Sequence, residues 1–346
     1  MSSLAKAVIA WQLQHGRHDL PWQNTTNPYH IWVSEIMLQQ TQVSTVFDYY
    51  TRFIARFPDV ASLANATQEE VLQQWSGLGY YSRARNLHHA AHTIVNDFSG
   101  VFPSKFDDIQ SLSGIGRSTA AAIVAFAFNQ PQPIMDGNVK RVFTRYFLLE
   151  GYPGLSSIQK KLWQLAESNM PIKNVATYTQ GLMDLGATLC TRSKPNCDYC
   201  PLNSNCEALK QNRINELPTP KPRKISPAKK ITMLIFLYGN EVMLEKRPPD
   251  GIWGGLWSFP EIDIHQIATG FAIQRFGLEV EVLEPLANIN HVFTHFKLQI
   301  TPQPLQVIRK NKQANQAGCI WLSVDDAIGA AIPTPVRKIL QTLCVV

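Results

Sequence analysis

Hydrophobic residues recur at helical spacing from Leu4 to about Glu207. Between Tyr29 and Phe53 they return every three or four positions without an intervening Gly or Pro, which is typical of one long helix. Gly, Pro and Asn interrupt the other apolar runs and mark their ends. The pattern predicts an all-α region with further helices at Thr67–Gln74, Arg83–Asn96, Arg117–Phe128, Val139–Leu149, Ile158–Ser168 and Val175–Thr188.

The pattern changes after the helical region. Several prolines are interleaved with lysine and arginine over residues 211–230, and such a stretch reads as an extended basic linker. Beyond it, Ile231–Tyr238 and Glu241–Lys246 flank a Gly-Asn turn, and alternation at Phe296–Ile300 indicates another strand. With helices expected at Ile264–Phe276 and Pro335–Leu343, the chain divides into an all-α domain (1–210), the linker (211–230) and an α+β domain (231–346).

Length, hydrophobicity and net charge further restrict the class of protein. The chain has 346 residues, about the length of two domains. No uncharged apolar run approaches the roughly 18–20 residues of a membrane-spanning helix, and the amino terminus resembles no leader peptide, so we expect a cytoplasmic protein with no membrane partner. The net charge of +6 is compatible with a polyanionic partner such as nucleic acid, and equally with a slightly basic enzyme.

Four cysteines are concentrated in one short segment. Cys190, Cys197, Cys200 and Cys206 are separated by six, two and five residues, which indicates a metal site in a cytoplasmic chain. A zinc site is the main alternative, but zinc ribbons usually offer two paired knuckles and only Cys197 and Cys200 form one. The asymmetric loops favour an iron–sulfur cluster on spacing alone.

A glycine-rich turn precedes one of the predicted helices. In the string from Leu112 to Ala120, Gly114 and Gly116 would let the backbone approach a phosphate, and Ser118 could add a hydroxyl donor at the helix start. Taken by itself, such a turn is more often structural than ligand-binding.

Two carboxylates are candidates for catalysis. Glu35 is flanked by apolar residues in a predicted helix, where burial would raise the pKa of its carboxyl and suit it to act as a general acid. Asp136 precedes the helix expected at Val139. From the residues alone, an exposed helix glutamate and a helix-capping aspartate are the commoner interpretations.

These features together resemble the endonuclease III and MutY family of DNA glycosylases. The four cysteines match the spacing of that family's cluster loop, Leu112–Ala120 looks like its helix–hairpin–helix, and Ser34–Val43 closely matches a MutY signature. Ser113 departs from the family, which usually has Pro there. The resemblance implies an all-α helix–hairpin–helix glycosylase domain with an iron–sulfur cluster loop, followed by an α+β Nudix (MutT)-like domain. It also implies a [4Fe-4S] cluster on the four cysteines, with Arg192 of that loop facing DNA.

The resemblance further implies roles for single residues. Glu35 would protonate adenine, Asp136 would stabilise the cationic sugar, and Asn138 would orient Asp136. Ser118 stands where strand-cleaving relatives have a lysine, so no intrinsic lyase activity is expected. The implied DNA-binding residues are Gln40, which fills the gap left by the flipped base, Tyr80, which wedges beside the opposite base, and Gly114, Gly116, Ser118, Lys140 and Arg192.

The resemblance extends into the second domain. Gly251–Pro260 matches the MutT-like domain of the family, but the expected helix Ile264–Phe276 lacks the glutamates of a Nudix hydrolase, so pyrophosphatase activity is not expected. In the family this domain recognises 8-oxoguanine through a Phe-Ser-His loop. Phe293, Thr294 and His295 match that loop, with Thr in place of Ser.

The predicted function is therefore excision of adenine mispaired with 8-oxoguanine or guanine in duplex DNA, by hydrolysis of the N-glycosidic bond. An endonuclease III-like glycosylase for oxidised pyrimidines is one alternative. A non-catalytic iron–sulfur redox sensor that binds DNA is another. We expect a monomer; a sliding-clamp contact occurs in this family, but no motif here identifies one.

Overall fold

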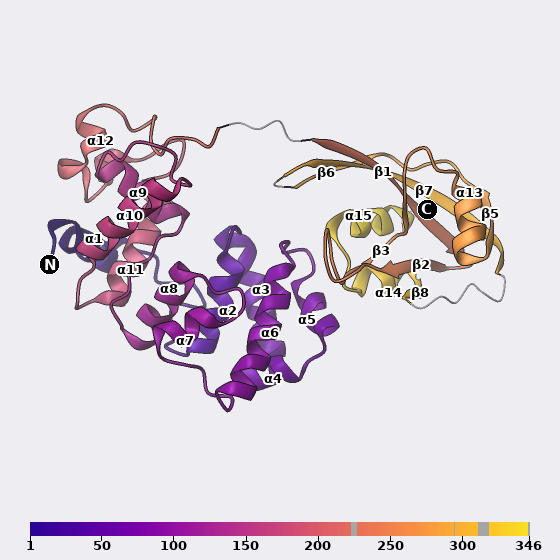
Figure 1. Ribbon diagram of the computed structural model, residues 1–346, viewed down its shortest axis with the longest axis horizontal. Helices are drawn as coiled ribbons and strands as arrows, with labels where there is room; N and C mark the ends of the chain where they lie inside the picture. Colours follow the sequence, from indigo (N-terminus) through magenta and orange to yellow (C-terminus); the bar gives the residue numbers. More distant parts are fainter. Residues whose placement is uncertain (223–226, 294, 311–317, 345–346) are drawn as a thin grey trace. The chain divides into compact units, whose positions relative to one another are not determined.

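The chain folds as two units of different secondary structure. The computed structural model describes residues 1–222, 227–293, 295–310 and 318–344. One unit comprises Met1–Asn65 and Asn86–Arg223, and the other comprises Ala66–Arg85 and Lys224–Val346 (Figure 1). No helix in these described ranges is long and apolar enough to cross a bilayer.

The first unit is helical, as the sequence pattern predicts. Its described helices are α1 (Ser3–His15), α2 (Pro28–Leu38), α3 (Val43–Arg56), α4 (Val60–Asn65), most of α6 (Ser82–Asp97), α7 (Phe106–Ser111), α8 (Arg117–Phe128), α9 (Gly137–Tyr146), α10 (Ser156–Asn169), α11 (Val175–Asp184) and α12 (Glu207–Lys210). A π-helical turn, Leu185–Leu189, continues α11.

Helix α8 is the centre of this unit. Every residue from Ala120 to Ala125 is buried, and four of these six are alanines, whose small side chains let neighbouring helices approach closely. Helix α2 packs along α8. This packing brings residues of α2 near the amino end of α8, where the glycine-rich turn lies.

The prediction of one helix over Tyr29–Phe53 is wrong. Helix α2 ends at Leu38 and α3 begins at Val43, with Gln40 between them in the left-handed region at φ 58°. Neither Gly nor Pro is needed for this break, because tertiary contacts stabilise it: the Gln39 side chain donates a hydrogen bond to Thr119 Oγ1 on α8, at 3.2 Å. The hydrophobic period alone did not reveal this bend, because apolar residues continue at helical spacing on both sides of it.

Two other predicted helices are shorter than expected, and a third changes from α to π geometry before its end. Helix α9 ends at Tyr146 rather than Leu149, and α11 gives way to the π-helical turn after Asp184. The segment expected at Ile264–Phe276 is helical only as α13 (Ala268–Phe271) and a π-helical turn that Gly277 ends at φ 65°. Apolar residues lie after Tyr146 and before Ala268, so the hydrophobic period alone overestimates the lengths of these two helices.

The second unit is built on a mixed sheet. Its described strands are β1 (Ala228–Tyr238), β2 (Glu241–Lys246), β3 (Trp257–Ser258), β4 (Glu261–Ile262), β5 (Leu278–Val282), β6 (Ile289–Val292), β7 (Lys297–Lys310) and β8 (Cys319–Ser323). The order is β3-β2-β1-β7-β5, and β4 also pairs with β1, β6 with β7 and β8 with β2. Strands β1 and β7 are parallel, and the other pairs described here are antiparallel. Helices α14 (Val324–Gly329) and α15 (Thr334–Leu343) follow the sheet.

Residues 66–85 belong with this second unit, although they lie within the predicted helical domain. On α5 (Gln68–Trp75), the Glu69 carboxylate accepts hydrogen bonds from Lys246 Nζ at 2.9 Å and Trp257 Nε1 at 2.5 Å. Farther along, the Arg337 guanidinium donates to Ser76 Oγ at 3.0 Å. The loop after α5, which carries Tyr80, is thereby fixed against the α+β unit.

Strand β1 begins three residues earlier than the sequence pattern predicts. Its pairing with β7 already starts at Ala228, opposite Lys297. Part of the basic segment is also held against the helical unit, because Leu217 is buried and its carbonyl accepts a hydrogen bond from Arg145 Nε at 2.9 Å.

Candidate active site

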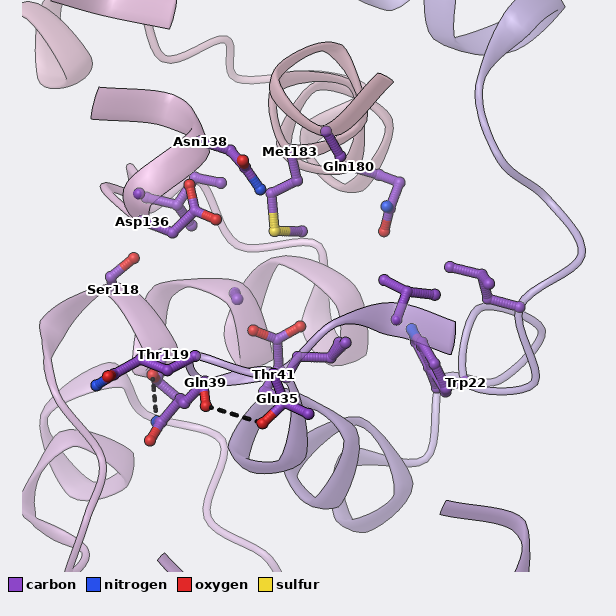
Figure 2. Close-up of a pocket in the computed structure, with 18 of the residues that line it drawn as sticks. Trp22, Glu35, Gln39, Thr41, Ser118, Thr119, Asp136, Asn138, Gln180 and Met183 are labelled. Carbon is purple, nitrogen blue, oxygen red and sulfur yellow. Dashed lines mark hydrogen bonds between the residues drawn. The ribbon is translucent and has the colours of Figure 1, made fainter. Parts of the chain in front are cut away.

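A cavity of about 480 Å³ opens where α2, the glycine-rich turn and the start of α9 meet (Figure 2). Glu35 of α2 and Asp136 before α9 both project into this space. Six of the residues singled out from the sequence line it: Glu35, Gln40, Gly116, Ser118, Asp136 and Asn138. The fold thus brings together residues that are about 100 positions apart in the chain.

Glu35 is held in its protonated form. Burial raises the pKa of its carboxyl to about 8, and the negative charge of Asp136 adds to the shift. The side chain borders this cavity and a second one of about 380 Å³. A carboxyl with this pKa carries a proton at neutral pH and can donate it to a bound base.

Asp136 sits in a different electrostatic environment. It is the N-cap of α9, where its Oδ1 accepts a hydrogen bond from the Val139 N–H at 2.7 Å. Burial raises the pKa of Asp136, whereas the backbone N–H groups of Val139 and Asn138 and the charge of Arg141 act in the opposite direction. Burial is the largest of these effects and leaves the pKa of Asp136 raised, while the two N–H donors and Arg141 limit the rise. One cavity therefore holds two carboxyls in unlike surroundings.

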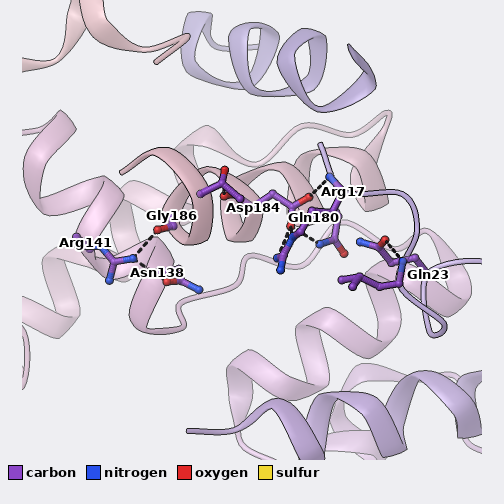
Figure 3. A network of polar contacts seen from close by, with 9 residues as sticks. Arg17, Gln23, Asn138, Arg141, Gln180, Asp184 and Gly186 are labelled. Atoms are coloured by element: carbon purple, nitrogen blue, oxygen red, sulfur yellow. Dashed lines mark hydrogen bonds and ion pairs between the residues drawn. The ribbon is translucent and has the colours of Figure 1, made fainter. Parts of the chain in front are cut away.

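The Asn138 side chain bonds to Arg141 (Figure 3). Arg141 Nη2 donates to Asn138 Oδ1 at 2.7 Å and to the Gly186 carbonyl at 2.6 Å, while its Nε donates to the Cys190 carbonyl at 2.7 Å. Gly186 packs so closely that an added Cβ would lie 2.5 Å from Asn138 Cβ. Arg141 therefore joins the start of α9 to the cysteine segment.

A buried ion pair on the far wall of the cavity was not foreseen from the sequence. Asp184, fully buried, accepts hydrogen bonds from the Arg17 backbone N–H at 2.9 Å and from Arg17 Nε at 2.8 Å. The Gln180 side chain donates to the same carboxylate at 2.9 Å, and both Arg17 and Gln180 line the cavity. The two partners are 167 positions apart, and no local motif marks such a pair.

The glycine-rich turn forms the amino end of α8. Gly114 adopts φ 79°, and a Cβ there would lie 2.8 Å from Asn86 Cβ, so the position requires glycine twice over. Gly116 is the N-cap of α8. The Ser118 hydroxyl accepts a hydrogen bond from the Met135 N–H at 2.9 Å, which ties α8 to the segment leading into Asp136.

The four clustered cysteines line one small cavity. Burial raises the pKa of Cys197, Cys200 and Cys206, and the proximity of the other thiols of the group adds to each shift. Arg145, itself buried, donates to Cys190 Sγ at 3.4 Å and to the Thr191 and Arg192 carbonyls at 2.7 and 3.2 Å. Within the described ranges, no three His, Cys, Asp or Glu side chains meet closely enough to hold a single metal ion.

A second large cavity, of about 620 Å³, lies within the α+β unit. Tyr80, Phe293 and His295 line it, so three predicted DNA-contacting residues lie together; Thr294 is outside the described residues. Tyr80 is 47% exposed and adopts φ 49°, an unusual conformation for a bulky side chain. Gly114, Lys140 and Arg192 line neither this cavity nor the one at Glu35.

Comparisons with known proteins agree with both units. The model of the HhH-GPD superfamily of base excision DNA repair proteins matches residues 33–168, and the NUDIX domain model matches residues 231–342. An adenine DNA glycosylase of Buchnera aphidicola is 39% identical over 98% of this chain and 96% of its own length. The adenine DNA glycosylase of Homo sapiens is 31% identical over 97% of this chain and 73% of its own.

Solved structures match the helical part. A thermostable thymine-DNA glycosylase aligns with a TM-score of 0.55 and 30% identity, over 60% of this chain and 95% of its own. Endonuclease III in a non-covalent complex with DNA aligns with a TM-score of 0.52 over 60% of this chain and 94% of its own. At 20% identity, the second likeness concerns the fold alone.

Proposed function

The chain belongs to the adenine DNA glycosylase family, and on that premise we propose that it hydrolyses the N-glycosidic bond of adenine paired with 8-oxoguanine or guanine in duplex DNA. The observation that carries the proposal is the pair of unlike carboxyls in one cavity. Glu35 is protonated at neutral pH, and Asp136 receives backbone hydrogen bonds that favour its ionised form. Cleavage of a glycosidic bond needs both.

The reaction begins with a proton. A base inside a duplex is inaccessible, so adenine must be flipped into the cavity. Glu35 then donates its proton to a ring nitrogen of adenine, N7 in our proposal, and the C1′–N9 bond breaks with its electron pair passing to the base. The cationic sugar faces the Asp136 carboxylate. Water adds to C1′, and the proton that it releases restores the two carboxyl groups to their starting protonation.

The proposed enzyme removes the base without cutting the strand. Ser118 cannot form an imine with the sugar, and its hydroxyl already accepts the Met135 N–H. Asn138 donates its backbone N–H to Asp136, while Arg141 holds its side chain. Gln40, exposed and in a left-handed conformation at the edge of the cavity, is suited to fill the gap left by the flipped base.

DNA contacts are proposed for residues around the cavity. Gly114 and Gly116 present backbone N–H groups at the start of α8 to a phosphate, and Lys140 and Arg192 add positive charge. We place the base opposite adenine, 8-oxoguanine in the preferred substrate, in the second cavity, which Tyr80, Phe293 and His295 line. The bacterial relative supports a bacterial cytoplasm as the cellular location.

A [4Fe-4S] cluster fits the four cysteines. Cys190, Cys197, Cys200 and Cys206 surround a common cavity, and the Arg145 guanidinium donates to Cys190 Sγ as second-sphere donors do to cluster sulfurs. A single zinc ion would require all four sulfurs about 2.3 Å from one point, whereas a cluster distributes its ligands over several irons. When bound, the cluster supplies structural cross-linking of this loop, and no proton step above involves it.

The test is single-turnover incubation with four duplexes, carrying A·8-oxoguanine, A·G, A·T or thymine glycol, each analysed with and without hot alkali. We expect cleavage at adenine opposite 8-oxoguanine and guanine only after alkali, with A·T intact. Nicking at thymine glycol without alkali would instead assign an endonuclease III-like activity. Tight binding with no cleavage of any duplex would favour the DNA-binding redox sensor. Glu35→Gln is the matched control, since it should bind the A·8-oxoguanine duplex without excising adenine.

A further inference from the structure

Trp253 has a strained backbone beside the second cavity. It adopts φ 56°, although its side chain is bulky and only 8% exposed. A large residue in the left-handed region costs on the order of 1–3 kcal/mol and persists only where its surroundings hold it. Strained residues of this kind are concentrated at ligand-binding and switch positions. The contacts of the Trp253 side chain indicate what the strained backbone serves.

Several polar contacts hold the backbone around Trp253 in place. Arg247 Nε donates to the Ile252 carbonyl at 2.9 Å, and Arg85 Nη1 donates to the Gly254 carbonyl at 2.8 Å. An added Cβ on Gly254 would lie 2.2 Å from the Pro249 carbonyl oxygen, so the turn is tightly closed. The segment cannot relax toward an ordinary conformation without breaking these contacts.

The Trp253 ring is directed into an aromatic group. Its centroid lies 5.6 Å from the His291 ring and 5.5 Å from the Phe293 ring, and the Arg247 guanidinium lies 5.8 Å from it. His291 and Phe293 are 4.5 Å apart, and Phe293 stacks on Phe296 at 4.6 Å. Trp253, which lies between β2 and β3, thus packs against Phe293 at the end of β6.

The connection that Phe293 begins is short. The Phe293 N–H donates to the Phe296 carbonyl at 2.9 Å, which closes the turn between β6 and β7. His295 follows in the same connection and lines the cavity. Phe293, Trp253 and Tyr80, the last from the loop after α5, line it as well. Because the side chains packed around a loop residue hold it in place, the Trp253 ring beside Phe293 helps to fix where Phe293 stands in the cavity.

We propose that Trp253 is a positioning residue for recognition of the base opposite adenine: its ring sets the place of Phe293 in the second cavity and so the preference for 8-oxoguanine over guanine. This inference rests on the proposed function, in which the second cavity takes that base. Trp253 acts through Phe293 and takes no part in breaking the glycosidic bond, so its removal affects discrimination between opposite bases more than excision itself.

The experiment compares single-turnover excision from A·8-oxoguanine and A·G duplexes by the full-length protein and by Trp253→Leu. Loss of two aromatic contacts should lower the ratio of the two rates by about tenfold. Trp253→Phe, which keeps a ring, should retain most of the preference. Trp321→Leu is the matched control: this tryptophan of the same unit contacts Tyr238 and Lys310, outside the cavity, and its loss should leave the ratio unchanged.

A double variant tests the route of the effect. If Trp253 acts through Phe293, the rate ratio of Trp253→Leu/Phe293→Leu should equal that of Phe293→Leu alone. A ratio that stays at the wild-type value in Trp253→Leu, or that falls equally in Trp321→Leu, overturns the inference. A purely structural role would lower both rates and the melting temperature together without changing the ratio. Absence of any 8-oxoguanine preference in the wild type would instead overturn the assignment of the cavity, and this inference with it.

Discussion

Replacing Glu35 by glutamine should stabilise the protein while abolishing its activity. Glutamine has nearly the same size as glutamate but cannot ionise. In the folded chain the pKa of Glu35 is raised from 4.5 to about 8, chiefly by burial. Between these two pH values the folded state keeps a proton that the unfolded state has lost. Stability contributed by this group is therefore fully present below pH 4.5 and is lost as the pH rises toward 8.

The size of the effect follows from the pKa difference. Each pH unit above the unfolded value lowers the free energy of unfolding by about 1.4 kcal/mol, until the folded carboxyl also ionises. At pH 7 this amounts to about 3 kcal/mol for a fully enclosed carboxyl. Because Glu35 borders two cavities, partial hydration reduces the shift, and we expect about 2–3 kcal/mol.

The assay is urea denaturation of wild type and Glu35→Gln at pH 5, 7 and 9, followed by tryptophan fluorescence. The variant should gain under about 1 kcal/mol at pH 5, about 2–3 kcal/mol at pH 7, and about 1 kcal/mol more at pH 9, where the folded carboxyl has also ionised. Wild-type excision should fall as the pH rises through about 8, while the variant should excise nothing at any pH. Glu167→Gln, an exposed substitution, should change stability by no more than about 0.5 kcal/mol.

Two results would refute this reasoning. A stability difference that does not vary from pH 5 to pH 9 would show that Glu35 is not held protonated by the fold. Excision by Glu35→Gln within tenfold of the wild-type rate would show that another group supplies the proton.

Three further predictions concern the surroundings of the site. Asp184→Asn should lower the free energy of unfolding by about 2–3 kcal/mol, because the neutral amide no longer pairs with the charged Arg17 guanidinium, which is itself 26% exposed; a loss below about 1 kcal/mol in urea denaturation would contradict this. Cys190→Ser should lose most of the bound iron and acid-labile sulfide that chemical analysis finds in wild type, and full retention of both would rule out this cysteine as a ligand. Gly114→Ala should lower stability by more than about 1 kcal/mol and weaken duplex binding in a fluorescence-anisotropy titration, because φ 79° and the nearby Asn86 both oppose a Cβ. Gly116→Ala, with nothing within 4 Å of the added atom, is its control, and equal effects of the two alanines would disprove the steric explanation.

Local sequence was sufficient for features that depend on short-range chemistry. The spacing of the four cysteines, the two glycines before α8 and the bounds of Arg117–Phe128 were all readable from neighbouring residues, and α8 has those bounds in the structure. The two-domain class, all-α followed by α+β, also follows from the change in hydrophobic period, and the family comparisons confirm it. Such signals persist because turns, caps and cofactor loops are determined within a few residues.

Tertiary structure alone decided how these parts combine. The break after Leu38 depends on a hydrogen bond from Gln39 to Thr119, and the Arg17–Asp184 ion pair joins residues 167 positions apart. Residues 66–85 join the α+β unit through contacts such as Glu69 with Lys246. The raised pKa of Glu35 likewise comes from burial by distant helices. Contacts between residues so far apart in the chain produce no periodic pattern in the sequence. Which residues meet depends on how the helices and strands pack against one another.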